Sequence, residues 1–535
     1  MILEISINLL PQEEKNEKVI NRKLFEQLEN KNITFTRENT TFVFVKKSID
    51  ARRKQVKLFM RYKAYIDELP GQENKIPEWK TVDDKCKKVI VAGSGPAGLF
   101  GAFTLLEKGI KPVIIERGQT THERKRDIAK ISTAGIVDGN SNYCFGEGGA
   151  GTFSDGKLYT RSNKRGSINS VLALFHYFGA DEKILTDAHP HIGTDKLPVI
   201  IENMRNKILE LGGEIHFNTR LESFITENST IVKGVHTVNT ITGEEKDFYG
   251  DALLLATGHS AFDIYESLAR TNPESLEAKT FAVGVRVEHP RELIDKIQFH
   301  GKNENLGAAE YRLVTQVDGR GVYSFCMCPG GFVVPSATEK DEIVVNGMSS
   351  AKRNSRWSNA AIVVETKPED IPQEFVEKAK AINCPQMAGL YWRRWLEQET
   401  FKHGNNQQAP AQLLTDFLKG KESQTLPQSS YTAGLTSSRL DLWLPEQIAN
   451  RLKKAFYDFD SRMKGYICDQ ALMIASETRT STPVRILRDK ESFQSTALKN
   501  LYPAGEGAGY AGGIVSSAMD GINSCLKIAQ ALLEK

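Results

Sequence analysis

Residues 87–118 read KKVIVAGSGPAGLFGAFTLLEKGIKPVIIERG, and this stretch sets the fold that the rest of the chain must fit. An apolar run at 89–92 predicts a buried parallel strand. The turn at 93–98 follows at once, and a helical repeat of apolar residues leads into a second apolar run at 113–115. A strand–turn–helix–strand unit with a GxGxxG turn is typical of dinucleotide-binding domains.

Each glycine of the turn has a separate predicted task. Gly93 permits the tight turn, Gly95 lets a pyrophosphate approach the backbone, and Gly98 lets the helix lie close to the strand. The helix N-terminus then directs free N–H groups at the phosphates, and Glu116 stands where a carboxylate is expected to bind a ribose hydroxyl. The predicted cofactor contacts in this stretch are Gly93, Gly95, Pro96, Ala97, Gly98, Glu116 and Arg117.

Length and charge narrow the class of protein. A chain of 535 residues predicts two to four domains. The net charge of +3 does not indicate a nucleic-acid or membrane partner, and no apolar run approaches the roughly 18 residues of a membrane span. The N-terminus lacks the basic region and cleavage site of a secretory signal. Seven cysteines, an odd number, suit a reducing cytoplasm, where we expect the protein to reside.

The pattern along the chain predicts five segments. Residues 1–66 alternate as strand, helix, strand and strand, with strands expected at 33–35, 42–45 and 56–65, which indicates a small α+β domain. Its basic patches suit an acidic partner or a solvated face. The remaining predicted segments are a linker (67–87), the first part of the cofactor domain (88–259), a mixed β/α substrate or cap domain (260–490) and the last part of the cofactor domain (491–535).

Two features of the cofactor domain favour FAD over NAD. Residues 145–157, FGEGGAGTFSDGK, are too rich in glycine and serine for a regular element and predict a loop that approaches the cofactor closely. Residues 221–249 predict a three-stranded meander between the third and fourth parallel strands, a layout of flavoproteins rather than of plain NAD dehydrogenases. The chain then ends with a strand, the turn GEGAGYAGG at 505–513 and a helix from about 514 to 533.

These elements together resemble the glutathione-reductase-type FAD proteins. More closely, the chain resembles the bacterial FAD-dependent protein / NAD(FAD)-utilizing dehydrogenase family, through the motifs at 48–52, 145–158, 325–331, 346–349 and 479–485. The resemblance implies an α/β fold with a two-dinucleotide-binding FAD domain, an inserted mixed β/α substrate domain and a small N-terminal α+β domain.

The resemblance also implies a set of FAD contacts. Gly148, Gly149, Phe153 and Ser154 would lie along the ribityl chain and the ring, with the Leu221 backbone near the adenine. Many relatives have Asp where this chain has Glu506. The remaining implied contacts are Thr257, Gly258, Gly505, Glu506, Gly512, Gly513 and Ile514.

Catalytic candidates lie in the middle segment. Cys326 and Cys328 form a C-x-C, which is either a reactive thiol site or, since alternate residues of a strand share a face, a pair of core cysteines. Arg479 and Arg485, with Arg286, are candidates to clamp a substrate carboxylate or phosphate, or else surface ion pairs.

Histidines give no clear catalytic or metal assignment. His259 and His289 are either general acids or structural histidines. The HPH motif at 189–191 has no partners at ligand spacing, so no metal site is predicted.

The favoured function is an FAD-dependent oxidoreductase that transfers a hydride to or from a small substrate, anionic in our interpretation. NAD(P)H is a candidate transient electron donor, since no second GxGxxG supports a dedicated nicotinamide domain. An NAD(P)-only dehydrogenase would need neither the meander nor the C-terminal glycine turn. An RNA-modifying flavoenzyme is disfavoured by the charge but kept open by basic residues between 46 and 63. A flavin-binding redox protein without turnover, with a protein partner on residues 1–66, is the other alternative.

Overall fold

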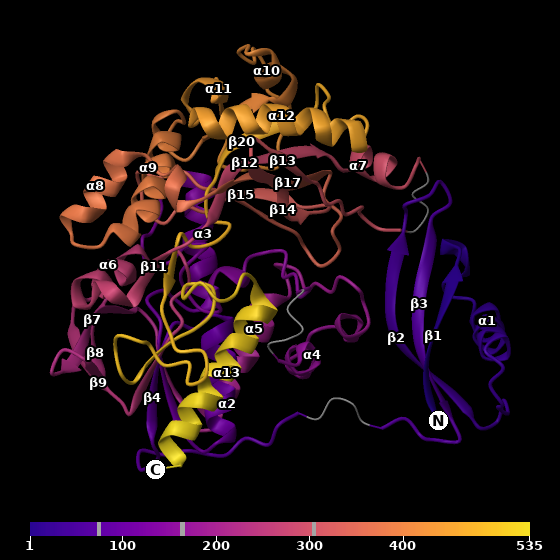
Figure 1. Ribbon diagram of the computed structural model, residues 1–535, viewed down its shortest axis with the longest axis horizontal. Coiled ribbons are helices and arrows are strands. Elements are labelled where there is room, and N and C mark those ends of the chain that lie inside the picture. Colours follow the sequence, from indigo (N-terminus) through magenta and orange to yellow (C-terminus); the bar gives the residue numbers. More distant parts are fainter. Residues whose placement is uncertain (72–75, 161–165, 302–305, 535) are drawn as a thin grey trace.

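The computed structural model describes residues 1–71, 76–160, 166–301 and 306–534 (Figure 1). A small N-terminal sheet stands at one side of the view, a parallel sheet with its helices lies below, and a larger, mainly antiparallel sheet lies above. None of the described helices has the length and apolar character needed to cross a bilayer.

The N-terminal sheet has the order β1-β3-β2, is antiparallel and carries one helix. Leu24 and Leu28 of the helix are buried in a small core against Leu58 and Met60 of the sheet. The predicted strand–helix–strand–strand order is confirmed, but the run 33–35 is not a strand. The elements are β1 (Ile2–Leu9), α1 (Glu17–Asn30), β2 (Thr40–Asp50) and β3 (Lys57–Ile66).

The parallel sheet has the order β22-β10-β4-β5-β6, so the last strand of the chain lies beside strands from the first half. The predicted strands and the predicted helix after the GxGxxG turn are confirmed. The strands are β4 (Lys88–Ala92), β5 (Lys111–Ile115), β6 (Glu214–His216), β10 (Ala252–Leu255) and β22 (Leu501–Pro503).

The two faces of this sheet bury alternate residues. Val89, Val91 and Ile114 pack in one core with α2 and α13, whereas Ile90 and Val113 pack in another core with the meander. The meander is predicted correctly, as three antiparallel strands in sequence order. The covering elements are α2 (Pro96–Glu107), α3 (Thr121–Ala134), α4 (Ile168–Tyr177), α5 (Leu197–Glu210), α13 (Ile514–Leu533), β7 (Thr219–Glu227), β8 (Ile231–Asn239) and β9 (Glu245–Tyr249).

The upper sheet has seven strands in the order β13-β14-β17-β12-β20-β18-β19. Helix α12 runs across its top, and α8 and α9 stand beside it (Figure 1). The sheet strands are β12 (Phe281–Pro290), β13 (Val314–Val317), β14 (Arg320–Cys328), β17 (Trp357–Thr366), β18 (Ala409–Leu413), β19 (Leu435–Ser437) and β20 (Leu472–Glu477).

Two small sheets and several helices complete the middle of the chain. The pair β15 (Phe332–Pro335) and β16 (Val345–Met348) and the pair β11 (Leu276–Ala278) and β21 (Val484–Ile486) are antiparallel. The helices are α6 (Phe262–Thr271), α7 (Arg291–Gln298), α8 (Gln373–Ala381), α9 (Ala388–Lys402), α10 (Leu414–Lys419), α11 (Leu440–Trp443) and α12 (Glu446–Arg462).

The middle segment holds two further differences from the sequence-based assignment. The apolar run at 412–418 alone predicts a helix, but it begins as the end of strand β18 and becomes α10 only at Leu414. The apolar run at 343–345 alone predicts a strand, but strand β16 begins only at Val345. Both runs are short and apolar, and such runs do not distinguish helix from strand without their tertiary contacts.

Candidate functional site

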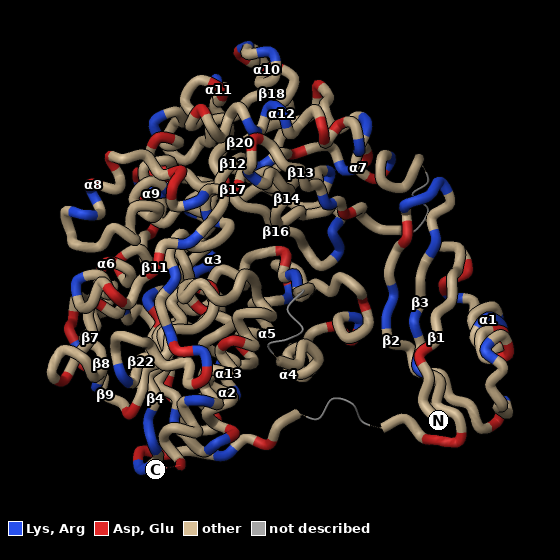
Figure 2. The backbone as a smooth tube through the Cα atoms, viewed as in Figure 1, with Lys and Arg blue, Asp and Glu red and all other residues tan. Residues whose placement is uncertain are grey.

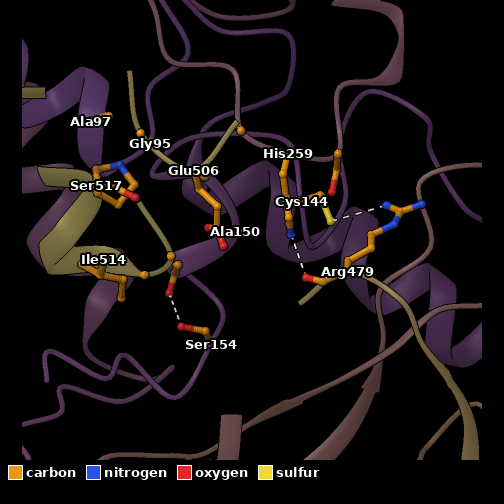
Figure 3. Close-up of a pocket in the computed structure, with 18 of the residues that line it drawn as sticks. Gly95, Ala97, Cys144, Ala150, Ser154, His259, Arg479, Glu506, Ile514 and Ser517 are labelled. Atoms are coloured by element: carbon orange, nitrogen blue, oxygen red, sulfur yellow. Dashed lines mark hydrogen bonds between the residues drawn. The ribbon is translucent and has the colours of Figure 1, made fainter. Parts of the chain in front are cut away.

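A cavity of about 850 Å³ opens where the parallel strands end beneath the upper sheet (Figure 3). Ala92, Ile115, Ala256 and Ala504, at or just beyond the carboxyl ends of four parallel strands, all line it. Open α/β sheets bind their ligands in the crevice at this edge. The cavity is therefore the candidate site, with the parallel sheet as its floor and residues of β14 among those of its roof.

Most of the predicted cofactor contacts line this cavity. The predicted residues at the cavity are Gly93, Gly95, Pro96, Ala97, Glu116, Arg117, Gly149, Ser154, Leu221, Thr257, Gly258, Gly505, Glu506, Gly512, Gly513 and Ile514. They come from the turns after β4, β5, β10 and β22, the glycine-rich loop, the meander and the start of α13, and so bring together segments more than 400 residues apart.

Three predicted contacts lie behind the cavity wall. A Cβ at Gly98 would overlap the Gly93 carbonyl oxygen, so Gly98 serves helix packing rather than ligand contact. Gly148 adopts a left-handed φ of +79°, and a Cβ there would overlap the Thr152 hydroxyl. Phe153 is buried beneath the Arg124 guanidinium, 5.1 Å from its ring centroid. The expectation that Gly148 and Phe153 line the cofactor path is therefore corrected: they shape the loop.

Glu116 ties two glycine-rich segments together. Its carboxylate accepts hydrogen bonds from the N–H groups of Ser94, Gly118 and Gly146, each 3.0 Å long, and from the Ser94 hydroxyl at 2.8 Å. Ser94 belongs to the turn after β4 and Gly146 to the glycine-rich loop, so the carboxylate fixes both segments. The predicted ribose contact stays a prediction, and this ordering role was not foreseen.

Arg117 is held beside the same end of the cavity. Its guanidinium pairs with both carboxylate oxygens of Asp263, at 3.2 and 2.9 Å, and lies 4.2 Å from the centroid of the Phe145 ring. A planar guanidinium fixed in this way presents a rigid wall rather than a mobile charge.

The Glu506 side chain projects into the cavity, and its carboxylate has no hydrogen-bond partner among the described side chains and backbone groups (Figure 3). Burial raises the pKa of this carboxyl to about 7, opposed only by the positive charge of Lys279. A polar group left unpaired beside a cavity is a candidate ligand contact, because burial without a partner is costly.

The predicted arginine clamp does not form. Arg479 lines the cavity, but its guanidinium donates to Glu397 at 2.7 Å and to Glu342 at 3.0 Å, and it also contacts the Cys144 thiol at 3.8 Å (Figure 3). These side chains, apart from that of Cys144, are almost wholly buried, so the Arg479 charge is neutralised within the protein.

The other two arginines are also engaged by groups of the protein. Arg286 is fully buried and donates to Glu477 at 2.9 Å and to Asn359 at 2.8 Å. Arg485 lies outside the cavity, on β21, and pairs with the surface carboxylate of Glu277 at 2.9 Å. Arg485 is therefore not a site residue, because its strand turns it toward solvent.

The two cysteines of the C-x-C point to different environments. Cys326 is exposed, lines the cavity and has a φ of +44°, whereas Cys328 is fully buried. The pairing register with β17 shifts between Phe325 and Cys328, which marks a β-bulge. The prediction that both side chains share one face is wrong for this reason. Burial raises the pKa of the Cys328 thiol to about 12, although Lys157 opposes that shift.

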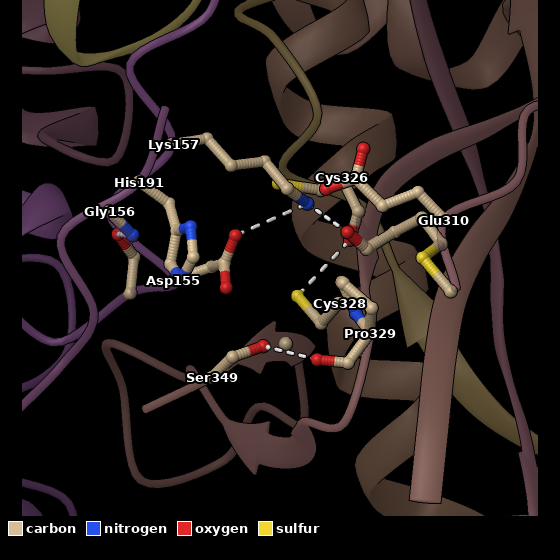
Figure 4. A network of polar contacts seen from close by, with 12 residues as sticks. Asp155, Gly156, Lys157, His191, Glu310, Cys326, Cys328, Pro329 and Ser349 are labelled. Carbon is tan, nitrogen blue, oxygen red and sulfur yellow. Dashed lines mark hydrogen bonds and ion pairs between the residues drawn. The ribbon is translucent and has the colours of Figure 1, made fainter. Parts of the chain in front are cut away.

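Lys157 is a site residue that sequence reasoning missed (Figure 4). Its ammonium group donates to the Met327 carbonyl oxygen of the roof and lies 3.6 Å from Asp155. Burial lowers the pKa of this ammonium, but Cys328 and Asp155 outweigh that effect and the net pKa is raised. Because the Cys328 thiol is neutral at pH 7, the Asp155 carboxylate is the anion that faces the charged ammonium there. The position of Lys157 at the end of the quoted glycine-rich loop was the only sequence signal.

Further ion pairs hold the Asp155 carboxylate in place beside Lys157. Arg353 donates to Asp155 and to Glu310, each at 2.6 Å, and His189 meets Glu310 at 2.8 Å. Burial would raise the pKa of Glu310, but the hydrogen bond from His189 and the charge of Arg353 hold it at about 2. The Asp155 carboxylate therefore interacts with both Arg353 and Lys157, so it neutralises only part of the Lys157 charge.

The histidines are engaged by backbone oxygens. His259 lines the cavity, and its Nε2 lies 2.7 Å from the Arg479 carbonyl oxygen (Figure 3). His289 lies in the core, 2.8 Å from the Tyr466 carbonyl oxygen. Burial lowers the pKa of each imidazole to about 4, which keeps both neutral at pH 7. Within the described ranges, no group of three His, Cys, Asp or Glu could hold a metal ion.

Comparison with known proteins matches three segments to family models. Residues 87–137 match an FAD binding domain, residues 280–480 match "FAD-dependent protein, C-terminal domain-like", and residues 1–65 match a domain of unknown function. An uncharacterized protein of Clostridium beijerinckii is 40% identical over 515 residues, which cover 92% of each chain. The chain belongs to the bacterial FAD-dependent protein family.

Solved structures resemble this FAD-dependent protein only weakly. The flavin-dependent brominase Bmp2 is 13% identical with a TM-score of 0.36, over 84% of this chain and 80% of its own. CtdE in complex with FAD is 10% identical with a TM-score of 0.33, over 84% of each chain. Similarities of this size do not assign a reaction.

The cavity fits the FAD that the family binds. A Cβ built on Gly95 would meet only the Cα of Gly149, at 3.8 Å, and one on Gly258 or Gly512 would meet nothing within 4 Å. The backbone at these points is therefore open to a ligand, as a pyrophosphate and a ring system require. Gly93, Gly95, Gly258, Gly505 and the start of α13 would hold FAD.

Proposed function

We propose that this FAD-dependent protein is an oxidoreductase that transfers a hydride between FAD and a small anionic substrate. The observation that carries the proposal is the charge of Lys157 on the wall of a cavity that also contains the nucleotide-binding turn. Arg286 and Arg479 are neutralised by buried carboxylates and are not available to a ligand. Lys157 and the exposed Arg312, which also lines the cavity, therefore remain to bind a substrate carboxylate or phosphate.

The parallel sheet, the meander and the C-terminal return support a two-dinucleotide-binding fold of the glutathione-reductase type, with a Rossmann-like first half. Bound FAD supplies the hydride chemistry. The chain would supply the rest: Lys157 orients the anion, Tyr323 and Phe325 of the roof limit access of water, and the α13 N-terminus offers a positive dipole end.

The direction of hydride transfer determines whether the flavin needs a second electron donor or a second electron acceptor. A substrate that gives a hydride and a proton leaves two electrons on the cofactor, and a substrate that takes them needs a donor, for which we propose transiently bound NAD(P)H. All seven cysteines are free thiols, which supports a dehydrogenase or reductase of the cytoplasm.

The test is the visible spectrum of the purified protein, followed anaerobically with NADH, NADPH and then a panel of small carboxylates, phosphates and neutral alcohols. We expect a flavin spectrum that one of these bleaches, and we expect Lys157→Met to raise the KM of an anionic substrate at least 10-fold, with partial rescue by Lys157→Arg. A flavin that only neutral substrates bleach would overturn the anionic assignment. A protein that binds no FAD would overturn the whole proposal.

A further inference from the structure

The small net charge of the chain conceals an uneven distribution. Residues 1–66 contain fourteen Lys and Arg against eight Asp and Glu, a net charge of +6, whereas the whole chain carries +3 and the remainder therefore −3. The hairpin of β2 and β3, residues 40–66, holds eight of these cations and only one carboxylate, Asp50. Figure 2 shows the cations along both strands and around the turn between them.

One face of this sheet is covered and the other is open. Leu58, Met60 and Tyr62 of β3 are buried in the core with α1, so the residues between them project from the opposite face. Phe59 lies there with 40% of its side chain exposed. The strand register places Asn8 of β1 and Ser48 of β2 on either side of it. An aromatic ring between an amide and a hydroxyl is a platform for a nucleic-acid base.

Cations surround this platform. Lys57 and Arg61 lie two residues to either side of Phe59, and Lys46 is paired in register with Arg61. Arg61 contacts Glu4 at 3.3 Å and therefore adds little net charge. At the turn, Arg52 pairs with Asp50 at 2.7 Å.

Four cations of the hairpin have no ion pair within the described part of the chain. Three of them, Arg53, Lys54 and Lys57, are exposed, and Lys46 is half-buried on the open face. Several unneutralised cations beside an exposed ring are the combination that binds the backbone and bases of a single strand.

The hairpin docks beside the cavity. The Lys47 N–H donates to the Thr186 carbonyl oxygen at 3.0 Å, and the Ala188 N–H donates to the Lys47 carbonyl oxygen at 2.9 Å. The next residue, His189, lines the cavity and leaves 59% of its side chain exposed, so it stands where the cavity opens. A chain bound on β2 would therefore lie next to the cavity entrance.

We infer that the β2–β3 hairpin is a docking surface for single-stranded nucleic acid. Phe59, with Asn8 and Ser48, receives a base, and Lys46, Arg53, Lys54 and Lys57 receive phosphates. Charge complementarity favours a polyanion, and the exposed ring on a flat sheet favours bases over an acidic protein surface. The turn RRKQ at 52–55 has no apolar side chain to enter a membrane. The inference does not depend on the flavin chemistry.

The test measures binding of the full-length, FAD-loaded protein to fluorescent single-stranded RNA and DNA 12-mers and to a duplex of the same sequence. Four phosphate contacts predict a slope of log K against log salt of about −2.8, which is a roughly 50-fold loss of affinity between 50 and 200 mM salt. The variant Arg53→Gln/Lys54→Gln/Lys57→Gln is expected to reduce that slope to about −0.7. Phe59→Ala is expected to weaken binding about 5- to 100-fold without changing the slope.

A control variant carries the same charge change elsewhere. Lys15, Lys18 and Lys31 are exposed and flank or belong to α1, and their replacement by Gln is expected to leave binding unchanged. The inference is overturned if neither single strand binds at 50 mM salt, if both triple variants lose affinity equally, if the duplex binds as tightly as the single strands, or if only vesicles of anionic lipid are bound. The spectrum of the bound flavin, measured separately, decides the proposed function.

Discussion

The floor and the roof of the cavity are built in opposite ways. The floor presents backbone: Gly95 and Gly258 bring the main chain to the surface because they carry no Cβ, and Gly93, with a φ of +105°, lets the turn pass close to the Ala256 carbonyl group. The roof and its surroundings present charge: Arg286 is buried with Glu477, and Arg479 with Glu397. The first arrangement is sensitive to volume and the second to charge balance.

This difference shows how the two halves share the work. A backbone surface accepts a large, fixed cofactor of one shape, while paired charges hold the roof strands in place without offering a free cation to the ligand. Lys157 joins the two, since it belongs to the loop of the floor and donates to Met327 of the roof. Substitutions on the floor should therefore act through cofactor binding, and substitutions on the roof through stability.

The largest effect is expected from Gly98→Ala. The new Cβ would overlap the Gly93 carbonyl oxygen and would lie 3.1 Å from a methyl group of Val91, so helix α2 must move away from β4. We expect FAD binding to fall more than about 100-fold, measured by retained flavin absorbance.

Gly95→Ala separates the steric effect on the fold from the effect on the ligand. Its Cβ would find only Gly149, at 3.8 Å, so the FAD-free protein should keep its thermal midpoint while FAD binding weakens. If Gly98→Ala protein binds FAD as tightly as the wild type, the close packing of α2 on β4 is not needed to form the cofactor site.

Arg479→Met is expected to be the most destabilising change in the roof. It leaves the buried carboxylates of Glu397 and Glu342 without their main cation, and the loss of one partner from a buried pair costs about 3–5 kcal/mol. Arg485→Met is the matched control, because its pair with Glu277 is exposed and worth about 0–1 kcal/mol. Urea unfolding of both variants measures the difference, and equal losses would contradict the contrast between buried and exposed pairs.

The floor could be predicted from sequence because its contacts are local. Gly93, Gly95 and Gly98 fall within one turn, and their spacing alone states what each must do. The interactions of the roof could not be predicted, because they join residues that are far apart in the sequence. Glu477 pairs with Arg286 across 191 positions, and Lys157 donates to Met327 across 170 positions. The sequence around Arg479 does not indicate that it pairs with Glu397 and Glu342.

The cysteine pair shows a second limit. In a regular strand, residues two apart share a face. A bulge between Phe325 and Cys328 breaks this alternation. The bulge depends on pairing with the neighbouring strand, which the local sequence does not reveal. The helix α9, which includes the fully buried Trp392, was missed for a related reason: apolar residues occur on most of its faces, so it lacks an amphipathic pattern.

A smaller, pH-dependent effect is expected at the unpaired carboxyl of the floor. Burial raises the pKa of Glu506 to about 7, so between pH 4.5 and 7 the native FAD-free protein binds more protons than the unfolded chain. Its stability should therefore fall as pH rises through this window, by about 1–3 kcal/mol. Glu506→Gln should remove this part of the decline, and Glu277→Gln, on the surface, should not. Thermal midpoints at pH 5 and pH 8 give the comparison; parallel declines in wild type and Glu506→Gln would refute it.

The smallest effect is expected where the roof meets the cavity, at Cys326. Because its side chain is exposed, Cys326→Ser should change the free energy of unfolding by less than about 0.5 kcal/mol, whereas Cys328→Ser places a hydroxyl in the core and should cost about 1–3 kcal/mol. Maleimide labelling of the native protein reports the same difference. The tryptic peptide that contains both cysteines should carry one label in the wild type and in Cys328→Ser, and none in Cys326→Ser. A label that persists in Cys326→Ser would show that Cys328 is accessible and would contradict the bulge that turns the two side chains to different faces.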